Sequence, residues 1–88
     1  MRAAGVLMGK HRSKLEQQIE ILLMLDQEDC LQSDIMYGCK LTHIRLVNLL
    51  QELVEKSLVA WNERTGRYYL TIAGKDCLGR YAAWRELI

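Results

Sequence analysis

The chain has 88 residues, half of them hydrophobic, and its 12 basic and 11 acidic residues leave a net charge of +1 at pH 7. This length suits one small domain with a single core and excludes a second domain of ordinary size. The three cysteines are odd in number and lack paired spacing, so we expect reduced thiols and a cytoplasmic location. The apolar run in Met1–Met8 is too short for a signal peptide or a membrane span, so we expect no membrane association.

The first helix is predicted from Ser13 to about Gln27. Ser13 and Glu16 form an S-x-x-E capping box, which satisfies two free amides at a helix start. Apolar residues then recur at helical spacing, at Leu15, Ile19, Leu22 and Leu23. Residues 1–12 show no such period and contain two glycines, so we expect them to form a flexible arm.

A second, short helix is predicted over Asp34–Tyr37. Ser33 is expected to cap it, and Gly38 is expected to end it in the left-handed conformation. Leu31, which precedes this helix, is expected to form a single strand bridge.

A third helix is predicted from His43 to about Lys56, with Thr42 as its cap. At about 100° per residue, one face collects the leucines that we expect to be buried, Leu46, Leu49, Leu50 and Leu53. The opposite face collects side chains that we expect in solvent, Ile44, Arg45, Asn48, Gln51 and Glu55.

The rest of the chain predicts a hairpin and a fourth helix. Leu58–Asn62 and Arg67–Leu70 are rich in β-branched and aromatic residues, and Gly66 suits the turn between them. Thr71 is expected to cap a helix over about 72–88. The predicted fold is therefore mainly α with a small β-hairpin (α+β): a winged helix-turn-helix over residues 13–88, with a three-helix core, a wing and a C-terminal dimerisation helix.

Several short motifs resemble those of a family of small archaeal winged-helix DNA-binding proteins. They are I-M-Y-x-x-x-L-T at Ile35–Thr42, E-K-S-L-V at Glu55–Val59 and Y-Y-L-T-x-x-G-K at Tyr68–Lys75, with the leucine stripe between the first two. The resemblance implies a transcriptional regulator or a chromatin-associated protein that dimerises through its C-terminal helix. The chain departs from the family at Ser57, where glycine is usual, and in the shortness of its last helix.

The third helix is predicted to enter the major groove, because the N-terminal half of such a helix usually contacts bases. Arg45 suits guanine, Asn48 and Gln51 suit adenine, and Ile44 suits a thymine methyl group. An ordinary solvated helix face is the alternative for the polar residues. Around this helix we expect further contacts, mainly to the DNA backbone, from Lys40, Thr42 and His43. Arg64 and Arg67 on the wing, about residues 63–67, are expected on the backbone or in the minor groove. Three basic residues near the start of the chain are expected to add backbone contacts, namely Lys10, Arg12 and Lys14.

The fourth helix predicts a homodimer. Four residues follow a coiled-coil spacing, with a fifth beside them, and we expect a dimer seam at Cys77, Leu78, Tyr81, Trp84 and Ile88. The alternative is that Leu78, Tyr81 and Trp84 close the core of their own domain. In a dimer, the two third helices would need to lie about 34 Å apart to read a palindromic site.

The sequence predicts no cofactor, no metal site and no enzymatic activity, because it has two histidines, no C-x-x-C pair and no phosphate-binding loop. We expect a sequence-specific double-stranded DNA-binding protein associated with the nucleoid. The alternative is a winged-helix module that binds a protein partner and no DNA. A contiguous positive face would favour the first function, and an apolar patch around Ile44, Val47 and Trp61 would favour the second.

Overall fold

The computed structural model describes residues 13–86, with side chains through Tyr81. Within this part the helices are α2 (Lys14–Gln27), α3 (Gln32–Gly38), α4 (His43–Glu55) and α5 (Ile72–Glu86), and the strands are β1 (Val59–Asn62) and β2 (Arg67–Leu70). The predicted mainly α fold with a small hairpin is confirmed. The predicted arm and Ile88 lie outside the described residues.

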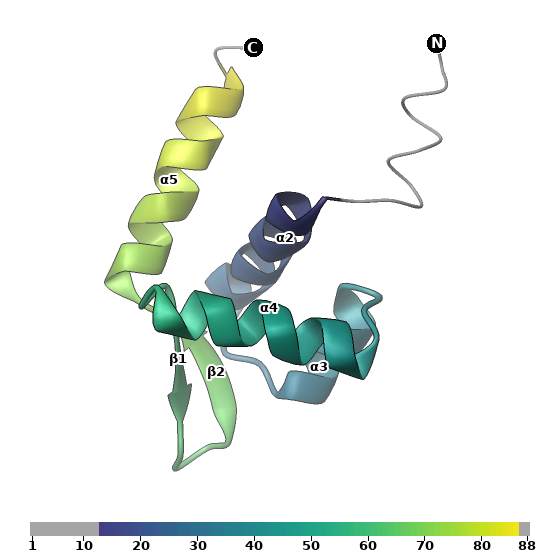
Figure 1. Ribbon diagram of the computed structural model, residues 1–88. Helices are drawn as coiled ribbons and strands as arrows, with labels where there is room; N and C mark the ends of the chain where they lie inside the picture. Colours follow the sequence, from purple (N-terminus) through teal and green to yellow (C-terminus); the bar gives the residue numbers. More distant parts are fainter. Residues whose placement is uncertain (1–12, 87–88) are drawn as a thin grey trace, which may run out of the picture.

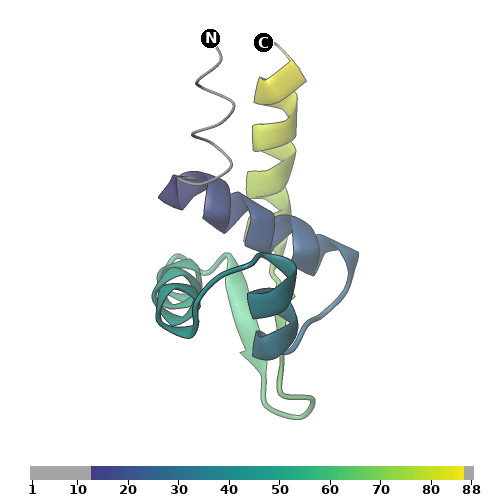
Figure 2. The same cartoon turned by 90° about the vertical axis from the view of Figure 1, so that its right-hand side faces the viewer.

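The first three helices form the body of the domain, and α2 contacts α3, α4, α5 and β2. The hairpin projects from one end of this body, while α5 runs in the other direction and extends past α2 (Figures 1 and 2). One long side of α4 faces α2, and no described element covers its other side (Figure 1). This arrangement leaves α4 and the hairpin together on one part of the surface.

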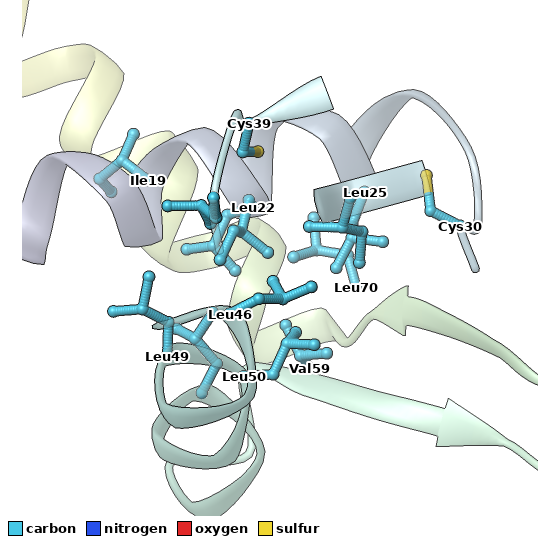
Figure 3. Close-up of a cluster of buried hydrophobic side chains, with 14 of the residues drawn as sticks. Ile19, Leu22, Leu25, Cys30, Cys39, Leu46, Leu49, Leu50, Val59 and Leu70 are labelled. Carbon is cyan, nitrogen blue, oxygen red and sulfur yellow. The ribbon is translucent and has the colours of Figure 1, made fainter. Parts of the chain in front are cut away.

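The core forms where α4 meets α2 and the strands (Figure 3). All four leucines of the predicted stripe on α4 are at most 3% exposed, which confirms the helical pattern. They pack with buried residues of the other elements, including Ile19, Leu22, Leu25, Ile35, Val59 and Leu70. Burying each of these side chains stabilises the fold by about 1.5–3 kcal/mol relative to exposure.

The start of α2 is as predicted. Ser13 Oγ accepts a hydrogen bond from the backbone of Glu16 at 3.1 Å, and the Glu16 carboxylate accepts one from the backbone of Ser13 at 3.0 Å. The predicted apolar face is only partly correct, because Leu15 is 62% exposed and Leu23 is 46% exposed. These two leucines lie one turn on either side of buried Ile19.

The helix α3 begins two residues earlier than predicted, and Ser33 is not its cap. Leu31 is the N-cap residue, and its backbone N–H donates to Asp34 Oδ2 at 3.2 Å. The strand bridge lies at Cys30 rather than Leu31, and it pairs Cys30 with Tyr68 through hydrogen bonds of 3.1 and 2.7 Å. This bridge holds the segment before α3 against the hairpin, and α3 begins two residues after Cys30.

The turn between α3 and α4 corrects the prediction for Gly38. Gly38 is helical, and the left-handed residue is Lys40, with φ of 55°. The backbone N–H groups of Lys40 and Leu41 close the end of α3 on the carbonyls of Tyr37 and Met36, which is a Schellman motif. Gly38 makes room for Met24 instead, because a Cβ there would lie 2.7 Å from Met24 Cε.

The junction of α4, β1 and α5 is closed by hydrogen bonds. Ser57 ends α4 with a φ of 63°, the conformation for which the usual residue is glycine. Thr71 donates its hydroxyl to the carbonyl of Ser57 at 2.6 Å, and its own N–H bonds the carbonyl of Leu58 at 3.1 Å. A Cβ on Gly74 would overlap the Leu58 carbonyl oxygen, so the glycine lets α5 approach this turn closely.

The two strands form an antiparallel hairpin in which Val59 pairs with Leu70 and Asn62 pairs with Arg67. Gly66 has a φ of 71°, as its place in the turn predicts. None of the helices in the described part of the chain is long and apolar enough to cross a membrane.

Candidate nucleic-acid interface

The outer face of α4 carries three of the four side chains that were predicted to contact DNA bases. Thr42 caps the helix by accepting a hydrogen bond from the backbone of Arg45 at 3.2 Å, so capping accounts for its position. Ile44 is 74% exposed, and Asn48 and Gln51 are also exposed. These three side chains lie as predicted on the face opposite the leucine stripe.

Arg45 does not share that face, which corrects one of the predictions. Its side chain is half-buried on the flank of α4 that turns toward α2. There Arg45 Nε donates a hydrogen bond of 2.8 Å to Gln17 Oε1. Arg45 still lines a hollow of about 400 Å³ together with Asn48 and Gln51. The structure thus brings these three predicted base-contacting residues to one depression.

A second contact between α2 and α4 lies further along the same flank. Lys14 Nζ is 2.7 Å from a carboxylate oxygen of Glu52. The hydrogen bond from Lys14 holds the pKa of Glu52 below its ordinary value, and Gln18 contributes in the same direction. The negative charge of Glu52, which would repel a phosphate, is therefore balanced within the domain.

The other flank of α4 is apolar. Val47 is 38% exposed and Val54 is 42% exposed, and both line a hollow of about 230 Å³ that Tyr68 of the hairpin closes on one side. At the start of this flank, His43 Nδ1 lies 3.4 Å from the side-chain nitrogen of Gln32, within hydrogen-bonding distance. This flank can contact thymine methyl groups or an apolar partner surface.

The two wing arginines are used differently. Arg64 is exposed near the tip, where its backbone N–H is fixed by Asn62 Oδ1 at 2.9 Å. Arg67 instead lies against the start of α3, with Nη1 3.9 Å from Asp34 Oδ2 and 3.5 Å from the carbonyl oxygen of Asp29. Arg64 is therefore accessible to solvent, whereas Arg67 is paired within the domain.

Lys40 occupies the turn before α4 and is exposed, in the left-handed conformation described above. Its position next to the amino end of α4 suits a contact with a phosphate. The predicted contacts from Lys10 and Arg12 fall in the part of the chain outside the described residues.

The surface predicted for a protein partner is divided between two places. Trp61 is 54% exposed and lines a separate hollow of about 790 Å³ with the acidic segment Asp26–Asp29. Val47 and Val54 line the hollow on α4. Val47 and Trp61, two residues of the apolar patch expected around Ile44, Val47 and Trp61, therefore line different hollows.

Three of the five residues of the predicted dimer seam pack within their own domain. Leu78 is 7% exposed and belongs to the core, while Cys77 and Tyr81 pack against the core from α5. Leu78 is thus a core residue rather than a seam residue, as the alternative interpretation allowed. The side chain of Trp84 lies beyond the described side chains, as does Ile88.

Among the described residues, no group of three or more histidine, cysteine or acidic side chains is placed to hold a metal ion. Cys30 and Cys39 are buried, and the pKa of the Cys30 thiol is raised by burial and then by the nearby charges of Asp34 and Glu28. These two cysteines act as small core residues.

Gln17 is the residue of this interface that the sequence did not identify. It carries no charge and lies 28 positions before Arg45 in the sequence, on a different helix. No local motif links the two positions, so only the packing of α2 against α4 could reveal the pair.

Comparison with known families agrees with this arrangement. The model of a winged helix-turn-helix family matches residues 11–88, which is most of the chain. The protein therefore belongs to a winged helix-turn-helix family, and domains of this class are in general DNA-binding, regulatory and non-enzymatic. Comparisons with curated proteins and with solved structures gave no match.

Proposed function

We propose that this protein binds double-stranded DNA in a sequence-specific manner and regulates transcription, with α4 in the major groove. The observation that carries this proposal is the geometry of α4: four leucines anchor one face, while Ile44, Asn48 and Gln51 stand exposed on the opposite face. A helix in this setting fits the width of the major groove, which is about 12 Å.

These three exposed side chains each have a matching group on a base edge. Asn48 and Gln51 can each form two hydrogen bonds with adenine, and Ile44 can contact the methyl group of thymine. Arg45, in the hollow beside them, can donate two hydrogen bonds to guanine.

The surroundings of α4 supply contacts to the phosphate backbone. Lys40 and Arg64 are both exposed, one in the turn before the helix and the other on the wing. Thr42 and His43 lie at its amino end, where free backbone N–H groups favour an anion. Arg67 can join them only by exchanging Asp34 for a phosphate.

Fluorescence anisotropy with random and selected duplexes at two salt concentrations tests this function. We expect tighter binding to the selected duplex and a log–log salt slope of about −0.9 for each phosphate neutralised. Asn48→Ala should reduce the preference for the selected duplex by about 1–3 kcal/mol. Arg64→Ala should weaken binding to both duplexes alike. Equal binding to all sequences would leave a DNA-packaging role and contradict the specific one.

One observation favours a second function, the binding of a protein partner. The chain is nearly neutral, and Ile44, Val47 and Val54 expose apolar surface on α4. In this alternative, Ile44→Glu would abolish capture of the partner, and no duplex would bind to the wild type at low salt. Duplex binding that falls with salt would reject it.

We place a homodimer interface on the side of α2 and α5. Leu15 and Leu23 leave apolar surface on α2, the helix against which α5 packs. Trp84 and Ile88, which the sequence assigns to the dimer seam, lie outside the described side chains. Leu15→Glu and Trp84→Glu should each give a monomer in sedimentation velocity. A wild-type protein that stays monomeric at high concentration would contradict this assignment and leave DNA binding by a single domain.

A further inference from the structure

The side chain of Gln17 holds the guanidinium group of Arg45 across the contact between α2 and α4. Arg45 Nε donates a hydrogen bond of 2.8 Å to Gln17 Oε1, and the bond is partly buried. Arginine side chains on an open helix face move among many rotamers, and ordering them on binding weakens an interface. Gln17 restricts this motion before any ligand arrives.

We infer that Gln17 is a positioning residue, which presents the two terminal amino groups of Arg45 to O6 and N7 of a guanine in the major groove. The inference rests on the proposed DNA-binding function and names the base that this flank of α4 reads. The hydrogen bond to Gln17 uses Nε, so both terminal amino groups remain for a two-point contact. Arg45 shares its hollow with Asn48 and Gln51, which places these amino groups beside the other readers.

The neutral partner is important for this role. Gln17 orients the guanidinium group without cancelling its positive charge. Arg67 on the wing is the contrasting case, because Asp34, its partner at 3.9 Å, is a carboxylate. The guanidinium group of Arg45 therefore keeps its positive charge and its attraction for hydrogen-bond acceptors of DNA.

Two carboxylates line the same hollow as Arg45, those of Glu52 and Glu55, and Glu52 is held by another partner. Glu52 lies two turns after Arg45 on α4, and it pairs with Lys14 at 2.7 Å. The two contacts run in parallel between the helices: Lys14 with Glu52, and Gln17 with Arg45. This pairing keeps Glu52 from competing with DNA for Arg45.

The test is the loss of binding when a guanine loses its N7 acceptor. A preferred duplex is first selected from a random library with the wild-type protein, and each guanine is then replaced in turn by 7-deazaguanine. We expect one position at which the wild type binds about tenfold more weakly after the replacement. Gln17→Met, which keeps the length of the side chain but removes the acceptor, should reduce this penalty to less than about threefold.

Two further variants separate positioning from stability. Gln17→Glu keeps the acceptor, so the penalty at that guanine should remain while overall affinity falls because of the added negative charge. Glu52→Gln weakens the neighbouring contact between the same two helices and should leave the penalty unchanged. Thermal unfolding of all variants checks that they are folded at the assay temperature, so that a general loss of stability is not read as a loss of base recognition.

Other results would overturn the inference. A full penalty in Gln17→Met would show that Gln17 is dispensable, and tighter binding by this variant would show that Gln17 withholds Arg45 from DNA. An equal loss on all duplexes would assign Arg45 to a phosphate. A wild type that binds duplexes without any penalty at guanine would reject this inference alone, whereas a wild type that binds no duplex would reject the proposed function as well.

Discussion

The two ends of α4 are built alike but are held differently. The turn that precedes α4 and the turn that follows it each contain a left-handed residue that is not glycine, Lys40 with φ of 55° and Ser57 with φ of 63°. Each turn closes the preceding helix with the same pair of backbone hydrogen bonds. Each is also associated with a threonine that caps a helix, Thr42 for α4 and Thr71 for α5.

The difference lies in what packs against each turn. At the first turn Lys40 is exposed between the buried residues Cys39 and Leu41, and the nearby Gly38 faces the flexible side chain of Met24. The second turn is bound to α5 by both the hydroxyl and the N–H of Thr71, and Gly74 lies against its backbone. The comparison indicates that the carboxyl end of α4 is anchored by its contacts with α5. Its amino end, which is proposed to face DNA, should tolerate an added side chain at Gly38 more easily.

The largest expected effect distinguishes the two glycines. Gly74→Ala would place a Cβ against the Leu58 carbonyl oxygen and 2.6 Å from Leu70 Cδ1, and should lower the free energy of unfolding by about 3 kcal/mol. Gly38→Ala should change it by less than about 1 kcal/mol, because Met24 can move and alanine favours the helix. Urea unfolding measures both values. Equal losses of unfolding free energy in the two variants would contradict the proposed difference between the two turns.

The two capping threonines should differ by a smaller amount. Thr71→Val removes the acceptor for the N–H of Gly74 and the donor to the carbonyl of Ser57, and should lower the free energy of unfolding by about 2 kcal/mol. Thr42→Val removes only the cap of α4 and should lower it by about 1 kcal/mol. The same urea experiment makes the comparison. A larger effect at Thr42 would mean that the amino end of α4 is the firmer one.

The left-handed residues provide a pair that separates stability from binding. Ser57→Gly and Lys40→Gly should each raise the free energy of unfolding by about 0.5–1 kcal/mol, because glycine adopts positive φ without steric cost. Only Lys40→Gly should weaken DNA binding, since Ser57 lies at the anchored end of α4. Anisotropy on one duplex, alongside thermal unfolding, tests this. Equal affinity in both variants would remove Lys40 from the interface.

The smallest expected effect is a dependence on pH at the contact of α2 with α4. The pKa of Glu52 lies below its ordinary value of 4.5 in the folded protein, mainly because of the hydrogen bond from Lys14. A lowered pKa stabilises the folded state above the ordinary pKa and loses this contribution as the pH falls through the folded value. Between pH 5 and pH 3, the wild type should therefore lose slightly more stability than Glu52→Gln. Parallel pH curves for the two proteins would show that the pair contributes nothing.

Several elements could be predicted because their signals are local. The capping box at Ser13, the leucine stripe of α4 and the turn at Gly66 each depend on residues a few positions apart, and the structure has all three. The errors at Gly38 and Leu31 have another origin. A glycine near a helix end is the usual left-handed residue, but Gly38 is helical and lies against the side chain of Met24, which comes from a different helix.

In the candidate interface, too, the sequence placed some residues correctly and others not. The helical period alone was sufficient to place Ile44, Asn48 and Gln51 on the outer face of α4. It could not place Arg45 correctly, because a long side chain on the border of a face turns toward whatever partner the tertiary structure offers. That partner is Gln17, and Arg67 was similarly drawn to Asp34.

The sequence by itself determined the order of the elements and the buried face of α4, since these follow from residue type and short-range spacing. Only the tertiary structure decided which arginines are paired, which leucines of α2 remain exposed and why Gly74 must lack a side chain. These properties arise where segments far apart in the chain meet, and the meeting depends on the packing of the whole domain.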